Sequence, residues 1–75
     1  MRKIRELQDP KSCLNKAGGY EIIFVLRAKD SCAPDTIRDW IRRRLASGKN
    51  IETDAQMIEA NACADMMEHE RGYTF

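Results

Sequence analysis

Tyr20-Glu21-Ile22-Ile23-Phe24-Val25-Leu26-Arg27-Ala28 is the stretch that determines the expected fold class. It is rich in β-branched and aromatic residues and follows the pair Gly18-Gly19, which is typical of a turn. The pattern predicts a β-strand over residues 20–28. One face of this strand is apolar and consists of Tyr20, Ile22, Phe24 and Leu26. The other face is half apolar and consists of Glu21, Ile23, Val25 and Arg27. Such a strand is typical of a sheet that is covered on both sides.

Two amphipathic helices are expected after this strand. Residues 34–46 begin with Pro34, which suits the first position of a helix, and end before Gly48, which suits a helix stop. Their apolar stripe consists of Ile37, Trp40, Ile41 and Leu45. The second helix is expected from about Asp54 to Glu70, after the capping-box pattern Thr53-x-x-Gln56. Its expected apolar stripe consists of Ala55, Ile58, Ala62 and Met66, widened by Cys63 and Met67. The alanines are expected to let the neighbouring helix approach closely.

The expected fold is therefore α+β, a small domain with one strand region packed on two helices. Residues 1–10 are expected to form an N-terminal arm, 11–71 the domain and 72–75 a flexible tail. Because a lone strand cannot satisfy its own backbone groups, either the arm supplies a second strand or another copy of the chain does. Pairing across a dimer is favoured, since a chain of 75 residues has a marginal core and needs a partner, a metal or disulfides.

Metal, disulfide and catalytic chemistry are not expected. Cys13, Cys32, Cys63 and His69 lack the close spacing of a zinc site, and three cysteines do not form a disulfide framework. The sequence contains no nucleotide-binding or hydrolase motif. No apolar run suggests a signal peptide or a membrane span. We therefore expect a non-enzymatic cytoplasmic protein without a cofactor, in which the thiols stay reduced.

Charge is distributed unevenly although the net charge is only +1. Residues 1–44 carry a net +5, and residues 45–75 carry a net −4. This asymmetry favours self-association of basic and acidic faces, or an anionic ligand on the basic part. Ordinary solvated surface is the alternative interpretation.

The junction between the strand and the first helix is the candidate ligand site. A helix N-terminus offers free backbone N–H groups and the positive end of the helix dipole, which together suit an anion. The candidate residues are Arg27, Lys29, Asp30, Thr36, Arg38 and Trp40. In a complex with a phosphate-containing small molecule, the basic residues and Thr36 would hold phosphate, and Trp40 or Tyr20 would stack on a base. Alternatively, Asp30 pairs with Arg27 or Arg38, Thr36 only caps the helix, and Trp40 belongs to the core.

Four segments of the chain carry a shared pattern: Cys13–Ala17, Ile23–Asp30, Ala33–Trp40 and Ala64–Glu68. In these segments the chain resembles a family of short, mostly uncharacterised phage-encoded proteins. The chain departs from that pattern at residues 20–22 and in the basic run 42–44. The resemblance implies an accessory protein of a phage, of the kind that counters host defence by sequestering a nucleotide signal or blocking a host protein.

A second resemblance is to helix-turn-helix regulators of the excisionase and MerR type, on residues 36–43, Thr-Ile-Arg-Asp-Trp-Ile-Arg-Arg. It implies a DNA-binding protein in which 24–31 is the first helix and the helix at 34–46 reads DNA with Arg38, Arg42 and Arg43. The turn lacks its usual glycine, and residues 24–31 fit a strand better than a helix. A nearly neutral chain is also a weak candidate for binding the phosphate backbone.

Overall fold

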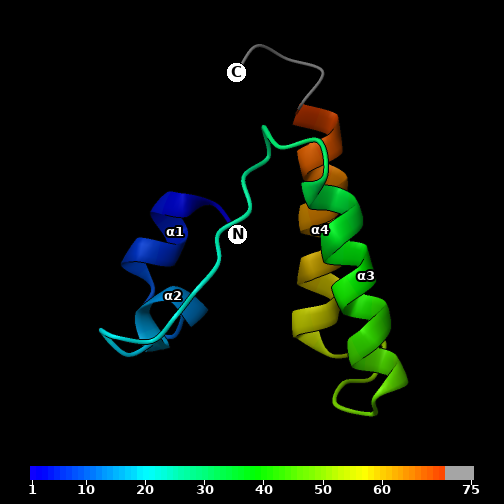
Figure 1. The fold of residues 1–75 in the computed structure, drawn as a ribbon, viewed down its shortest axis with the longest axis horizontal. Coiled ribbons are helices and arrows are strands. Elements are labelled where there is room, and N and C mark those ends of the chain that lie inside the picture. Colours follow the sequence, from blue (N-terminus) through cyan, green and yellow to red (C-terminus); the bar gives the residue numbers. More distant parts are fainter. Residues whose placement is uncertain (71–75) are drawn as a thin grey trace.

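A computed structural model describes residues 1–70, and these contain four helices joined by extended chain and turns. Helices α1 (Lys3–Gln8) and α2 (Cys13–Lys16) are short, whereas α3 (Ala33–Ala46) and α4 (Ala55–Glu70) are long. Figure 1 shows that α3 and α4 lie side by side as a hairpin. The two short helices lie apart from this hairpin and pack against each other.

The hairpin confirms the two helices expected from the sequence. Pro34 lies in the first turn of α3, and the backbone N–H groups of Ser47 and Gly48 bond to carbonyls of its last turn. Gly48 has a φ of 76°, a left-handed conformation that glycine adopts without steric cost. Asp54 precedes α4, and its carbonyl accepts bonds from the N–H groups of Met57 and Ile58.

The core of the hairpin is small and is made mostly of alanines. The buried apolar residues are Ala33, Pro34, Met57, Ala60 and Ala64. Their spacing on α4 shows that the stripe expected on Ala55, Ile58, Ala62 and Met66 was wrong, because all four of those residues are exposed. Cys63 and Met67, at the edge of the expected stripe, are half-buried. The buried face lies to one side of the expected one because α4 carries apolar residues around most of its circumference, so periodicity alone does not select a face.

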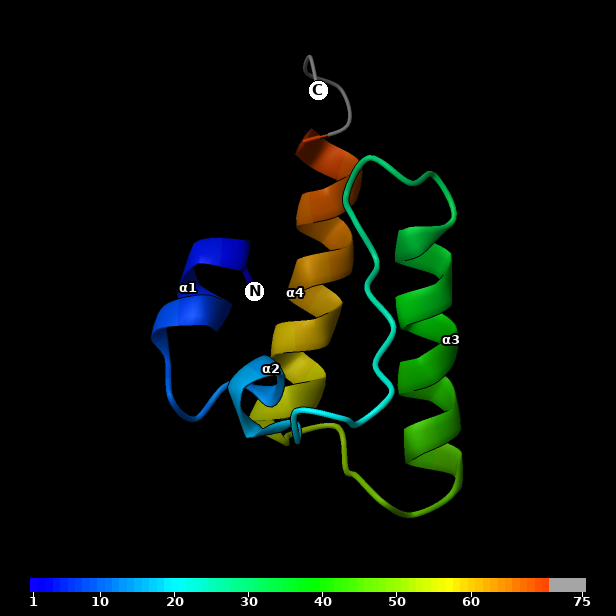
Figure 2. The same cartoon turned by 60° about the vertical axis from the view of Figure 1, so that its left-hand side comes forward.

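The expected strand, and with it the α+β fold class, is wrong. Residues 21–27 run extended between Gly18-Gly19 and α3 (Figure 2), but they form no ladder. Within residues 1–70, no main-chain group of residues 22–26 is hydrogen-bonded. The reason is that every other regular element of the described chain is a helix, and a helix offers no edge to an extended segment.

The N-terminal segment is helical, so it does not supply a second strand. Ser12 is buried, donates to the carbonyl of Glu6 at 2.6 Å and accepts from the backbone N–H of Asn15. The Asn15 amide donates to the carbonyls of Glu6, Leu7 and Asp9. We name residues 1–17 the helical pair. Arg2 forms an ion pair with Glu70 at the end of α4, which links the helical pair to the hairpin.

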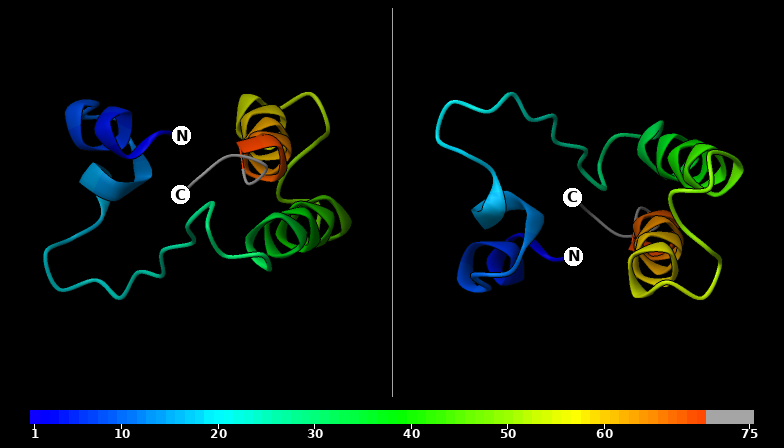
Figure 3. Two further views of the ribbon diagram at one scale, coloured as in Figure 1. Left: turned by 90° about the horizontal axis from the view of Figure 1, so that it is seen from above. Right: turned by 90° about the horizontal axis from the view of Figure 1, so that it is seen from below.

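The described chain is open and exposes an unusually large surface. Seen from above and below in Figure 3, the helical pair lies on one side and the hairpin on the other, joined by the extended segment. The accessible surface is 6248 Å² for 8.6 kDa, whereas a folded monomer of that mass exposes about 4,700 Å². The radius of gyration is 13.1 Å, compared with about 11 Å for a compact domain of this length. A single copy therefore leaves much of its surface uncovered.

Candidate functional site

Arg38, the basic residue of the expected anion site that lies within α3, is held by carboxylates. Its guanidinium donates to Asp65 at 2.8 Å and to Glu68, and both residues lie on α4. Asp35, one turn earlier, lies 3.7 Å away. These interactions raise the pKa of Arg38, with the Glu68 hydrogen bond as the largest cause. Arg38 thus joins α3 to α4, and its charge is already compensated.

The start of α3 is also occupied by groups of the chain itself. Asp30 accepts from the backbone N–H of Cys32 at 2.9 Å through its side chain and from Ala33 through its carbonyl. The Thr36 hydroxyl donates to the carbonyl of Cys32 at 2.8 Å. The N–H groups on which the expected site depends are therefore partly used by this turn.

Trp40 lies farther along α3 and is in contact with a different cation. The guanidinium of Arg44 lies over its ring, 5.6 Å from the centroid, a cation–π arrangement. Arg27 and Lys29 are exposed and, within residues 1–70, their side chains make no hydrogen bond or ion pair. Thr36, Arg38 and Trp40 thus each contact groups outside the expected site. The ligand site stays a prediction.

The arginines that the DNA-binding alternative requires are engaged as well. Arg42 and Arg43 both pair with Asp39, one turn earlier on α3. The hydrogen bond from Arg43 is the largest cause that lowers the pKa of Asp39. Residues 24–31 form no helix, so the first helix of that alternative is missing from the described chain.

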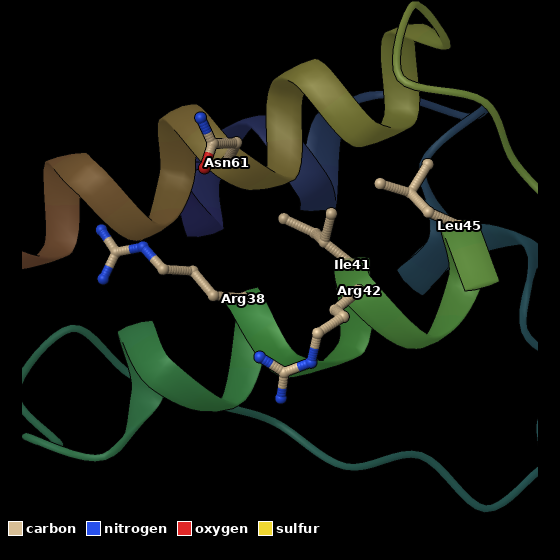
Figure 4. A pocket seen from close by; sticks show the side chains of 5 residues that line it. All are labelled: Arg38, Ile41, Arg42, Leu45 and Asn61. Carbon is tan, nitrogen blue, oxygen red and sulfur yellow. The ribbon is translucent and has the colours of Figure 1, made fainter.

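A shallow hollow of about 350 Å³ runs along the outer side of the hairpin (Figure 4). Ile41 and Leu45 point from α3 toward α4, whereas Arg42 points away from α4. The hollow is lined by Arg38, Ile41, Arg42, Leu45 and Asn61. The hollow is open, and Ile41 and Leu45 supply its apolar lining beside the polar side chains of Arg38, Arg42 and Asn61.

The largest feature that sequence reasoning missed is the exposure of residues 20–26, which we name the apolar segment. Tyr20, Ile22 and Phe24 are 104%, 97% and 86% exposed. Ile23 and Val25, on the opposite face, are also exposed, and only Leu26 is half-buried. The sequence pattern did indicate a need for packing partners, because apolar residues occur on both faces of the expected strand. The described residues bury neither face of this segment fully.

Metal chemistry finds no support in the described residues. Within residues 1–70, no cluster of three or more metal-ligating side chains is present. Cys13 and Cys32 are exposed free thiols, and Cys63 is a half-buried one. No helix of that range has the length and hydropathy to cross a membrane.

Comparison with known proteins leaves the fold and the apolar segment as the basis for any functional statement. No protein-family model, no curated protein and no solved structure matches the chain. The resemblance to phage accessory proteins and the resemblance to helix-turn-helix regulators both stay predictions.

Proposed function

We propose that the protein is a non-enzymatic binding protein whose working surface is the apolar segment. The observation that carries this proposal is the exposure of Tyr20, Ile22 and Phe24 beside a main chain that, over residues 22–26, makes no hydrogen bond within residues 1–70. Monomeric proteins rarely leave such a run uncovered, and exposed apolar patches mark interaction sites. The segment binds another protein chain.

The mode of binding is strand addition. An extended segment with unpaired N–H and C=O groups is a template for a second strand. The main chain would supply the affinity, and alternate side chains such as Ile22 and Phe24 would supply the selectivity. This mode needs no pocket, in keeping with the shallow hollows of the hairpin.

The electrostatics favour a protein partner over a nucleotide or DNA. Arg38 is shared among Asp35, Asp65 and Glu68, and Arg42 and Arg43 share Asp39. An anion would have to displace these carboxylates before it could pair with Arg38, Arg42 or Arg43. Of the two accessory roles that the resemblance implies, blocking a host protein in the cytoplasm is therefore the one we adopt.

Photo-crosslinking of the full chain in cells tests this function. Phe24 is replaced by p-benzoylphenylalanine, and the same residue is placed at Glu59, an exposed position on α4, as the control. We expect covalent adducts with a protein chain from position 24 and none from position 59. Absence of adducts at position 24, or equal yields at both positions, contradicts the proposal.

A further inference from the structure

The apolar segment is complementary to itself when two copies run antiparallel. If Phe24 of one copy lies opposite Phe24 of the other, residues whose numbers sum to 48 face each other. Ile22 then lies opposite Leu26, Ile23 opposite Val25, and Glu21 opposite Arg27. Because the arrangement is twofold symmetric, the Glu21–Arg27 pair occurs twice. Opposite charges in directly facing positions stabilise a strand pair.

Other registers lose this match. Centring the pair on Ile23 places Glu21 opposite Val25 and Arg27 opposite Gly19. Centring it on Val25 places Glu21 opposite Lys29 but Arg27 opposite Ile23, so a charge faces an apolar side chain. A parallel pair in register places Glu21 opposite Glu21, which is repulsive. Only the register centred on Phe24 matches charge with charge and apolar with apolar along the whole segment.

The two charged side chains are available for this pairing. The Arg27 guanidinium makes no hydrogen bond or ion pair within residues 1–70. Glu21 accepts one bond of 3.3 Å from the backbone N–H of Gly18, at the long end of the hydrogen-bond range. By contrast, the arginines Arg38, Arg42 and Arg43 of α3 are all paired within the chain. The Glu21 and Arg27 side chains are thus available to an external partner.

The surface of a single copy is also large enough to require a partner. The accessible surface exceeds that of a compact monomer of the same mass by well over 1,000 Å², and a stable interface buries about 800 Å² per partner. Strand pairing would cover one edge of the segment and bring the Phe24 side chains together. It leaves the other edge of each strand open, so a second protein can still add there.

We infer that two copies of this chain associate through an antiparallel pair of their apolar segments, centred on Phe24, with Glu21 of each copy facing Arg27 of the other. This inference rests on the proposed function, because it identifies the first chain that the segment binds. The resulting two-stranded ribbon supplies the main-chain partner that the described residues of a single copy do not offer.

Charge exchange on the purified full chain tests this arrangement. Light scattering over a wide range of protein concentration gives the dimer dissociation constant of the wild type, Glu21→Arg, Arg27→Glu and the double variant. Each single change creates two like-charge contacts, and we expect it to weaken the dimer by about tenfold. The double variant exchanges the two charges and is expected to recover wild-type affinity to within about threefold. Glu59→Arg, with the same charge change outside the segment, is expected to leave the constant unchanged.

The outcomes are distinguishable. A wild type that stays monomeric, single variants without effect, a double variant that is not restored, or a control as weak as the single variants would each overturn the inference. Unchanged helical circular dichroism in all variants shows that the hairpin is intact. If the wild type is monomeric but Phe24 crosslinks to another protein in cells, only the self-pairing fails. If it is monomeric and position 24 yields no adduct, the proposed function fails too.

Discussion

The α3–α4 hairpin and the apolar segment both carry large apolar side chains but treat them in opposite ways. The hairpin buries Ala33, Met57 and Ala64 and neutralises Arg38 with carboxylates of the facing helix. In the apolar segment, the side chains of Tyr20, Ile22 and Phe24 are exposed to solvent. The difference follows from backbone chemistry. A helix bonds its own N–H and C=O groups, whereas the backbone groups of an extended segment need another strand or water as partners. Within residues 1–70, the helices of the hairpin bond their own backbone groups, and the main chain of residues 22–26 makes no hydrogen bond.

Loss of buried volume in the hairpin should have the largest effect on stability. Met57 is 3% exposed, so Met57→Ala removes packed atoms and leaves a cavity. We expect a loss of about 2–5 kcal/mol in the free energy of unfolding. Urea unfolding followed by helical circular dichroism measures this loss in the free energy of unfolding. A variant that is already unfolded in buffer would also show a large loss of stability.

Met66→Ala is the matched control, because it makes the same change on the same helix at a residue that is 47% exposed. Its cost should stay within about 0.5 kcal/mol. Equal losses for the two methionines would show that the buried face of α4 is not the one formed by Met57, Ala60 and Ala64.

A change in the apolar segment should instead act on association. Phe24→Ser removes the central aromatic residue of the proposed strand pair without touching a helix. We expect helical circular dichroism to be unchanged and the dimer to weaken by at least about 2 kcal/mol, roughly thirtyfold in the dissociation constant. Light scattering measures the second effect. Loss of helix in this variant would mean that the segment supports the hairpin and is not independent of it.

The ion pairs between α3 and α4 should contribute less than the core. Arg38→Gln breaks the contacts to Asp65 and Glu68, and Arg42→Gln, its control, removes only a contact within α3. We expect a modest fall in melting temperature for Arg38→Gln, a smaller one for Arg42→Gln, and a difference that shrinks as salt is added. A difference independent of salt would contradict an electrostatic role.

Lowering the pH should weaken the Arg2–Glu70 ion pair between the helical pair and the hairpin. The hydrogen bond from Arg2 lowers the pKa of Glu70. A carboxyl group whose pKa is lower in the folded state adds stability above its unfolded pKa, about 4.3, and that stability is lost as pH falls through the folded value. Melting temperatures from neutral pH to about pH 3 should therefore fall more for the wild type than for Glu70→Gln. Parallel curves of melting temperature against pH for the two proteins would show that the Arg2–Glu70 pair does not contribute to stability.

The sequence predicted the helices well because their signals are local. Pro34 and Gly48 lie at the two ends of α3, as predicted. The buried face of α4 was mispredicted, since Ile58 and Met66 are as apolar as Met57 and only the position of α3 decides which is covered. The end of α4 at Glu70 agrees with the sequence, while the predicted tail at residues 72–75 lies outside the described residues.

The strand was mispredicted for a different reason. The side chains of Tyr20–Ala28 favour an extended backbone, and residues 21–27 are indeed extended. A strand also requires a partner edge, which is a property of the whole assembly and not of nine residues. The candidate ligand site required Arg38 to be unpaired. Arg38 instead pairs with Asp65 and Glu68, which lie about thirty residues later in the sequence, so no local sequence pattern indicates this pairing.

Amide hydrogen exchange of the wild-type protein at low and high concentration tests the apolar segment most directly. Our proposal predicts that alternate amides of residues 22–26, those on the paired edge, exchange rapidly when the protein is dilute and become protected as the concentration rises. The amides of α3 and α4 should be protected throughout. Protection of 22–26 that does not depend on concentration, or none at the highest concentration, would contradict it.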